Sequence, residues 1–202
     1  RRRLLLNLFL LVPAIASFHA VCFFLDWLLF PGLRRQELHS PVFIVGHARS
    51  GTTLLHRLMS EDRGRFSAFL LWELYFPSLL QKKLIRWLGK LDAELLGGAL
   101  GRRIEDWDRR KFAATQDIHP MSLFQPEEDD FVLTYACASG WWIVQLPYMR
   151  HLDFYYVDEW PERRRRRLLE LYAECVRRQL YLNGGNGHHL SKNPTYCGRV
   201  ES

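Results

Sequence analysis

The sequence predicts an α/β fold, in which a parallel sheet is flanked by helices and preceded by an apolar N-terminal helical segment. Residues 41–60 have the pattern of a short strand, a glycine-bounded turn and a helix, and residues 161–191 that of a long helix and a second short strand. Such alternation implies parallel strands joined by helical crossovers. The 202 residues suffice for one domain with its own core. We expect an N-terminal segment over residues 1–38 and one α/β domain over residues 39–202.

Composition narrows the class of protein and the kind of ligand. Hydrophobic residues make up 48% of the chain and charged residues 25%, which excludes a disordered chain. The net charge of +6 suits an anionic ligand or a membrane surface. The sequence contains no zinc-finger spacing, helix-turn-helix pattern or aromatic RNA-binding signature, so nucleic acid is not an expected partner. Its four cysteines form no C-x-x-C pair, and we expect buried free thiols in a reducing compartment, which favours the cytoplasm.

The stretch from residue 41 to residue 55 is the most informative part of the chain. Val42–Val45 is a run of β-branched and aromatic residues, typical of a strand buried on both faces. Gly46 and Gly51 bound a tight loop, and Thr52 and Thr53 open a helix. Free amides and the helix dipole favour an anion at such a helix start. The sequence therefore predicts an anion-binding loop and a P-loop-type sheet.

The loop differs from the version that binds nucleoside triphosphates. That version continues Gly-Lys-Ser/Thr, whereas Gly51 is followed here by two threonines and the cation stands earlier, at Arg49. The string Arg-Ser-Gly-Thr-Thr resembles the 5′-phosphosulfate loop of sulfotransferases that use 3′-phosphoadenylyl sulfate (PAPS). The alternative is an ordinary strand-turn-helix with a chance pair of glycines. The resemblance implies PAPS as co-substrate, no metal, and a binding loop made of His47, Ala48, Arg49, Ser50, Gly51, Thr52 and Thr53.

The N-terminal segment is apolar from Leu4 to Phe30, long enough to span a bilayer. Pro13, His19 and Asp26 argue against a simple anchor, because polar and charged groups at depth are costly. Two alternatives remain open: a membrane-embedded or interfacial helix pair, and a hydrophobic helix packed on the domain. A membrane surface facing the cytoplasm is accordingly an expected partner under the first alternative.

The segments that follow the loop are predicted mainly as helices. Residues 66–77 are rich in aromatics and fit a loop plus a short helix, and residues 78–100 fit a helix that stops at two glycines. Residues 102–117 form a highly charged, exposed stretch. A helix over residues 52–60 precedes them. Its apolar residues, expected to face the sheet, are Leu54, Leu55, Leu58 and Met59.

Two further helices and a strand are predicted in the second half. A helix should open at Pro126, which is followed directly by acidic residues, and run to about Cys137. Residues 161–182 form the clearest helix, and residues 188–191 a short strand after a glycine-rich turn. The predicted inner face of the long helix consists of Leu168, Leu171, Tyr172, Cys175, Val176, Gln179 and Leu180.

Sulfuryl transfer needs an anion cradle, a cation near the leaving oxygen and a base for the acceptor hydroxyl. For the cation we expect Lys192, because it ends a predicted strand of the same sheet, and strand ends meet at the ligand crevice. Ser-Lys-Asn-Pro-Thr at residues 191–195 also resembles the Lys-Asp/Asn-Pro element of tyrosylprotein-type and bacterial sulfotransferases, where the lysine is taken to stabilise the transition state. A surface lysine before a turn proline is the alternative.

For the base, Glu127 and Glu128 are the leading candidates. The string Pro-Glu-Glu-Asp-Asp at residues 126–130 resembles the Pro-x-Glu-Asp-Glu string of many bacterial sulfotransferases, which aligns Glu128 with the first acid of that motif. The alternative is an acidic helix start favoured by the dipole. His119 is the fallback, since other branches of the family use histidine.

The resemblance covers residues 41–202 and implies transfer of a sulfonate from PAPS to a hydroxyl group of a small-molecule or lipid-like acceptor. The family's Arg-x-Pro segment and later serine, which bind the 3′-phosphate, have no counterpart after Pro194, so we expect this piece alone to be inactive and its sheet to lack a strand. A P-loop kinase or nucleotide hydrolase, and a non-catalytic membrane-associated protein of the same fold, are the alternative functions. The missing lysine counts against the kinase.

Overall fold

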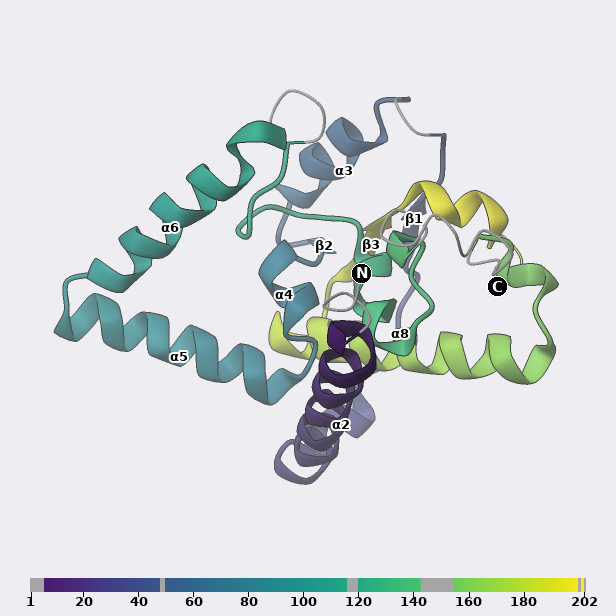
Figure 1. The fold of residues 1–202 in the computed structure, drawn as a ribbon, viewed down its shortest axis with the longest axis horizontal. Helices are drawn as coiled ribbons and strands as arrows, with labels where there is room; N and C mark the ends of the chain where they lie inside the picture. Colours follow the sequence, from purple (N-terminus) through teal and green to yellow (C-terminus); the bar gives the residue numbers. More distant parts are fainter. Residues whose placement is uncertain (1–5, 48–49, 116–119, 143–154, 200, 202) are drawn as a thin grey trace.

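The computed structural model describes residues 6–47, 50–115, 120–142, 155–199 and 201, with the backbone only at residues 7 and 8. Its sheet has three strands in the order β1-β3-β2, and both pairings are parallel (Figure 1). In the register, Val42 lies opposite Leu190 and Ile44 opposite Lys192. The strands are β1 (Val42–Ile44), β2 (Phe66–Ser67) and β3 (His188–Lys192).

Helices surround this small sheet. The helix α8 runs beside it, α2 lies in front of α8, and α5 and α6 form a V-shaped arm at the left of Figure 1. The α-helices are α2 (Val12–Leu29), α3 (Thr52–Ser60), α4 (Leu71–Tyr75), α5 (Leu79–Leu95), α6 (Ala99–Phe112) and α8 (Glu162–Leu182). A π-helical turn η1 (Asn7–Leu11) precedes α2, and the 3₁₀ segments are η2 (Pro31–Arg35), η3 (Ala113–Thr115), η4 (Asp129–Ala136), η6 (Val157–Glu159) and η7 (Pro194–Gly198).

The α/β class and the parallel pairing are confirmed, and so is the long C-terminal helix. Its predicted inner face is buried or half-buried at every position. The core forms where α8 packs with α4 and η4. Fully or nearly fully buried members of this core are Phe69, Leu71, Leu74, Leu133, Val157, Cys175 and Leu180.

The expectation that the first strand is buried on both faces is wrong. Ile44 is buried, but Phe43 is 43% exposed and Val45 is 47% exposed. The reason is position, because β1 is an edge strand of this sheet. Both exposed side chains border an apolar cavity of about 360 Å³ between β1 and α8.

The predicted orientation of α3 is also wrong. Leu54, Leu55 and Leu58 are 49–64% exposed, whereas His56 is 2% exposed. The helix packs on β3 through this histidine, which hydrogen-bonds the backbone of Leu190. Periodicity identifies the apolar face of a helix, but a specific polar contact has decided which face meets the sheet.

The helix expected to open at Pro126 begins instead at Asp129 and is a 3₁₀ helix. Pro126 forms an antiparallel bridge with Leu70, and the amide of Glu127 donates to the carbonyl of Phe69 at 3.0 Å, so this segment is extended. The end of the helix near residue 137 is as predicted.

Two elements went unpredicted. The stretch expected at residues 102–117 to be charged and exposed is helical and mostly exposed over its described part, residues 102–115, and α6 starts directly after Gly97 and Gly98, whose φ angles of 57° and 78° turn the chain after α5. Asp108 anchors it, accepting from Ser122 Oγ (2.7 Å) and the amide of Leu123 (2.8 Å). The strand β2 lies within the aromatic segment, whose short helix, α4, is as predicted.

Candidate active site

The described residues at the two ends of the loop between β1 and α3 lie close together. A Cβ atom at Gly46 would lie 2.9 Å from Thr52 Cγ2 and 3.1 Å from Ser50 Oγ, so a side chain there would force a shift. Ser50 donates from Oγ to the carbonyl oxygen of His47 at 2.6 Å. Gly51 has a left-handed conformation with φ of 81°, which glycine adopts without strain. The two glycines thus close a tight turn, as their spacing predicts.

The first amides of α3 lie directly after this turn. Within the described part of the chain no side chain caps them, and Thr52 and Thr53 are half-buried at the helix start. Uncapped amides at the positive end of a helix dipole favour an anion. Three predicted site residues, Ala48, Arg49 and His119, lie outside the described residues, and their placement stays a prediction.

Lys192 and Glu128 meet at the edge of the sheet from which the loop leaves. Lys192 is the last residue of β3 and pairs with Ile44 of β1, and Ile44 lies two residues before Gly46. Its side chain is 4% exposed, and its Nζ donates to Glu128 Oε1 at 2.5 Å. The Glu128 side chain is 27% exposed. In open α/β sheets, ligands bind at this carboxyl edge of the strands. The structure places Lys192 at this edge, as expected, and brings Glu128 to it, and their catalytic roles stay predictions.

Glu127 has a different environment from Glu128. It is 6% exposed, and its Oε1 accepts the backbone N–H of Glu128 at 3.0 Å. Both acids border a cavity of about 310 Å³, next to Asn193. Phe131 and Trp141 form another wall of this cavity, with ring centroids 5.1 Å apart. The cavity is therefore lined both by aromatic rings and by the acidic residues Glu127 and Glu128, whereas Lys192 reaches it only through its contact with Glu128.

A buried carboxylate that sequence analysis missed lies directly beside the pair. Asp129 is 1% exposed and is the first residue of η4, so it connects Glu128 with the strand that carries Lys192. Burial would raise the pKa of Asp129, but the hydrogen bonds that it accepts outweigh burial and hold this pKa below its usual value. Its donors are Tyr172 OH (2.5 Å), Tyr196 OH (2.5 Å), Ser191 Oγ (2.6 Å) and His189 Nε2 (3.0 Å).

The two tyrosines stay protonated donors in this cluster. Burial first, and then the charge of Asp129, raise the pKa of Tyr172 and of Tyr196 well above the ordinary value. The sequence carried one signal of the cluster. His189 and Ser191 are polar residues two positions apart in a strand, so they point to one face. The acid that joins them is 60 residues away and could not be identified from that spacing.

Asp130, the next residue, fixes the other side of the cavity. Its Oδ1 accepts from Arg199 Nη1, and its Oδ2 accepts from Ser139 Oγ and from the amide of Gly140, all at 2.7 Å. Asp130 and the Arg199 side chain are buried. The consecutive acids Glu128, Asp129 and Asp130 thus have different partners. Glu128 contacts Lys192, whereas Asp129 binds the side chains around it and Asp130 binds two side chains and the amide of Gly140.

Comparison with known proteins identifies the family. The sequence model of the Sulfotransferase family matches residues 41–201. The fold resembles the crystal structure of the sulfotransferase STF1 from Mycobacterium tuberculosis H37Rv (type 1 form), with a TM-score of 0.57 and 18% identity over 93% of this chain and 48% of that chain. The chain spans about half the length of that solved sulfotransferase. No curated protein matches. Because the family model covers most of the chain, this protein belongs to the sulfotransferase family.

Proposed function

We propose that this protein transfers a sulfonate group from PAPS to a hydroxyl group of a small-molecule or lipid-like acceptor. The observation that carries the proposal is the Lys192–Glu128 contact at the sheet edge where the loop begins. Membership of the family supports sulfotransfer in general. PAPS, the acceptor class and the two residue roles are what we add.

The loop fits the 5′-phosphosulfate end of PAPS. A Cβ atom at Gly46 would crowd the side chains of Thr52 and Ser50, so glycine lets the loop close tightly here, and the amides that start α3 are uncapped within the described residues. We assign residues 47–53 to this group, with Arg49 as the cation. The loop lacks the lysine that reaches the outer phosphates in nucleoside-triphosphate loops, which favours a nucleotide bound without a metal-bridged β/γ-phosphate pair.

Two side chains have the chemistry that the transfer needs. PAPS, when bound, supplies the sulfonate on a phosphate leaving group. Lys192 donates a hydrogen bond to the oxygen on which negative charge develops. Glu128 accepts the proton of the acceptor hydroxyl. Glu127 and His119 remain the alternatives for this second role.

The cavity beside the pair suits an acceptor with an apolar body. Its volume of about 310 Å³ is that of a small-ligand site, and Phe131 and Trp141 form an aromatic wall. An acceptor whose apolar body packs on this wall would share the cavity with Glu128, which also lines it. We place the reaction in the cytoplasm, because all four cysteines are free.

Nucleotide binding to the full-length protein tests the proposal. Isothermal titration should find that adenosine 3′,5′-bisphosphate binds without metal and more tightly than ATP with Mg²⁺. The reverse order would indicate a kinase or nucleotide hydrolase, and binding of neither would indicate a non-catalytic protein; both results would overturn the proposal.

A variant of the loop tests the assignment of its cation. Arg49→Ala should weaken bisphosphate binding by roughly 10- to 100-fold, the usual cost of losing a charged hydrogen bond. Arg103→Ala is the matched control, because Arg103 lies on the exposed surface of α6 and should have no effect. If Arg49→Ala and Arg103→Ala bind the bisphosphate equally well, the loop assignment is wrong.

A further inference from the structure

The helix α2 turns His19 and Asp26 inward and most of its large apolar residues outward. Its charged residue, Asp26, is fully buried, and His19 is 7% exposed. A helix at the boundary between a protein and water has the opposite arrangement. The outward face, defined here as Phe18, Val21, Phe24, Trp27, Leu28 and Leu29, consists of large apolar side chains that are each 51–62% exposed.

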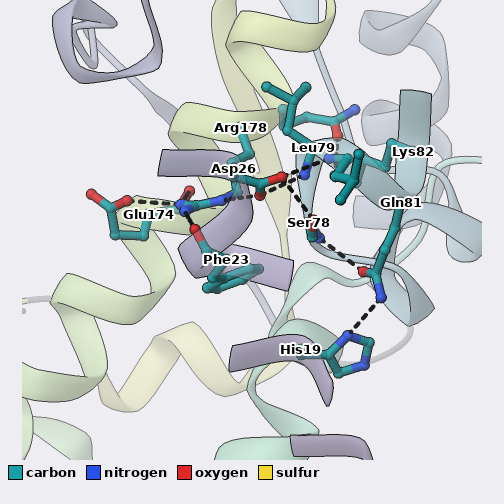
Figure 2. Close-up of polar contacts among 11 residues, drawn as sticks. His19, Phe23, Asp26, Ser78, Leu79, Gln81, Lys82, Glu174 and Arg178 are labelled. Atoms are coloured by element: carbon teal, nitrogen blue, oxygen red, sulfur yellow. Dashed lines mark hydrogen bonds and ion pairs between the residues drawn. The ribbon is translucent and has the colours of Figure 1, made fainter. Parts of the chain in front are cut away.

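Asp26 connects three helices, as Figure 2 shows. Its carboxylate accepts from Ser78 Oγ (2.9 Å) and from the amides of Leu79 (2.8 Å) and Leu80 (2.6 Å), so it caps the start of α5. It also accepts from Arg178 Nε of α8 at 2.8 Å, in a pair whose side chains are 0% and 4% exposed. These contacts fix α2 to the start of α5 and to α8.

This docking argues against a helix that crosses a membrane. Residues 9–29 are long and apolar enough to cross one by length and composition. A crossing helix, however, is surrounded by lipid or by other spanning elements, and the docked α2 would carry the polar start of α5 and Arg178 of α8 into the hydrocarbon. The inner face is already occupied, and only the outward face remains for a partner.

Cations and aromatic rings gather at the C-terminal end of this face. The Arg34 guanidinium lies 3.7 Å from the centroid of the Trp27 ring. Lys83 Nζ of α5 lies 4.6 Å from the Phe30 ring and 5.6 Å from the Tyr181 ring. Arg34, Lys83 and the neighbouring Arg35 are exposed. Aromatic rings beside lysine and arginine are typical of the boundary between lipid headgroups and acyl chains.

We propose that α2 lies in the plane of an anionic phospholipid surface. Its outward face enters the boundary of the acyl chains, and Arg34, Arg35 and Lys83 contact the phosphate groups. Amphipathic interfacial helices bind through the same combination of apolar area and positive charge. The inference does not depend on sulfotransfer, and the nucleotide experiment above tests that function separately.

Vesicle co-sedimentation of the full-length protein tests the proposal. It should bind vesicles of phosphatidylcholine with about 30% phosphatidylserine more tightly than vesicles of pure phosphatidylcholine, because the serine lipid supplies the negative charge. Phe24→Ser/Trp27→Ser/Leu28→Ser should weaken binding by about 100-fold or more. Arg34→Gln/Arg35→Gln/Lys83→Gln should weaken binding only to the anionic vesicles, by about fivefold per cation.

The matched control removes exposed apolar side chains elsewhere. Leu95, Leu96 and Leu100 are 52–74% exposed at the turn between α5 and α6, far from α2 in Figure 1. Their triple serine variant should bind vesicles like the unchanged protein. An equal loss in both serine variants would overturn the assignment to α2.

Three other results would overturn the proposal. Equally tight binding to neutral vesicles that survives carbonate extraction would indicate a crossing helix. A dimer in light scattering that the α2 serine variant dissociates, without vesicle binding, would indicate a second copy on this face. If the protein neither binds vesicles nor dimerises, the outward face of α2 is in contact with water or with another part of the protein. If bisphosphate binding is intact in these cases, the membrane inference alone fails.

Discussion

Two charged contacts in this molecule have nearly the same length but different surroundings. Between α2 and α8, Asp26 and Arg178 are both almost fully buried, and Asp26 is saturated by groups of the chain itself. At the sheet edge, Lys192 is buried but Glu128 is 27% exposed and borders a cavity. A saturated buried charge holds elements together. A charge at a cavity beside uncapped amides has capacity left for a ligand.

Asp129 combines features of the two regions. It is as buried and as saturated as Asp26, with four hydrogen-bond donors, yet it directly follows Glu128 in the chain. Three of its donors lie on α8 and β3. The candidate site therefore consists of a buried internal frame and one pair whose glutamate is part-exposed at a cavity, an arrangement that keeps reacting groups oriented.

The largest expected effect is a loss of turnover when the Lys192–Glu128 pair is changed, with little loss of stability. In the full-length protein, Lys192→Met and Glu128→Gln should each lower turnover by roughly 10²- to 10⁴-fold, because they remove the charge stabilisation and the base. The unfolding free energy should change by only about 1 kcal/mol, since one partner is part-exposed and methionine fills the lysine's space. Steady-state kinetics and urea unfolding measure the two quantities. Undiminished turnover in either variant would refute its assigned role.

The docking contact should show the opposite behaviour. Asp26→Ala leaves Arg178 buried without its partner, and the unfolding free energy should fall by about 3–5 kcal/mol. Bisphosphate affinity should be unchanged, because Asp26 contacts α5 and α8 and not the loop. Asp26→Asn, which keeps an acceptor, is the milder variant if the alanine variant does not fold. A loss of bisphosphate affinity in the folded variant would show that the two regions are coupled.

Asp129→Asn should affect both quantities at once. We expect a loss of about 3–5 kcal/mol of unfolding free energy, because a buried charged acceptor is removed from its donors, and a fall in turnover as Glu128 loses its support. The pKa of Asp129 is held below its usual value, so its contribution to stability is present above the ordinary carboxyl pKa and is lost as the pH falls below it. Urea unfolding at pH values from about 3 to about 7, a range that includes the ordinary carboxyl pKa, measures this. The unfolding free energy of the variant should depend less on pH than that of the unchanged protein.

Lys82 extends the comparison, because it is a buried cation to which no carboxylate of the described residues is hydrogen-bonded. Its Nζ donates to Gln179 Oε1 at 2.6 Å, and burial lowers its pKa to about 8. A lysine whose pKa is lower in the folded state destabilises the fold when charged. The unfolding free energy should therefore rise as the pH increases from about 8 to about 10.5, by at most about 3 kcal/mol. Lys82→Met should abolish this rise, and a rise of equal size in the variant would assign it to another group.

The smallest effect is expected for an exposed pair. Arg166 and Glu170 lie 3.7 Å apart on α8, with side chains that are 69% and 66% exposed. Solvent screens such a pair, so Arg166→Ala should change the unfolding free energy by less than about 0.5 kcal/mol. Thermal unfolding monitored by circular dichroism is sufficient to measure it. A change as large as that of Asp26→Ala would contradict the view that saturation and burial decide the strength of these contacts.

Local features of the sequence predicted much of this protein. The long helix α8 follows from its periodic apolar residues, and the turn between β1 and α3 follows from Gly46 and Gly51, because each depends on neighbours within a few positions. Lys192 was placed beside the loop by one topological rule, that parallel strands end at the same edge. The family motif favours Glu128 and Glu127 as the base, with His119 as the fallback, and this role stays a prediction.

Tertiary structure decided what depends on distant partners. The face of α3 that meets the sheet, the extended conformation at Pro126 and the donors around Asp129 are set by contacts with residues far away in the chain. Asp26 in an apolar helix suggested only that a simple anchor was unsuitable, whereas the fold shows it capping α5 and pairing with Arg178. Propensity and periodicity are local, but the burial of a charge is stabilised only by donors that the whole fold brings to it.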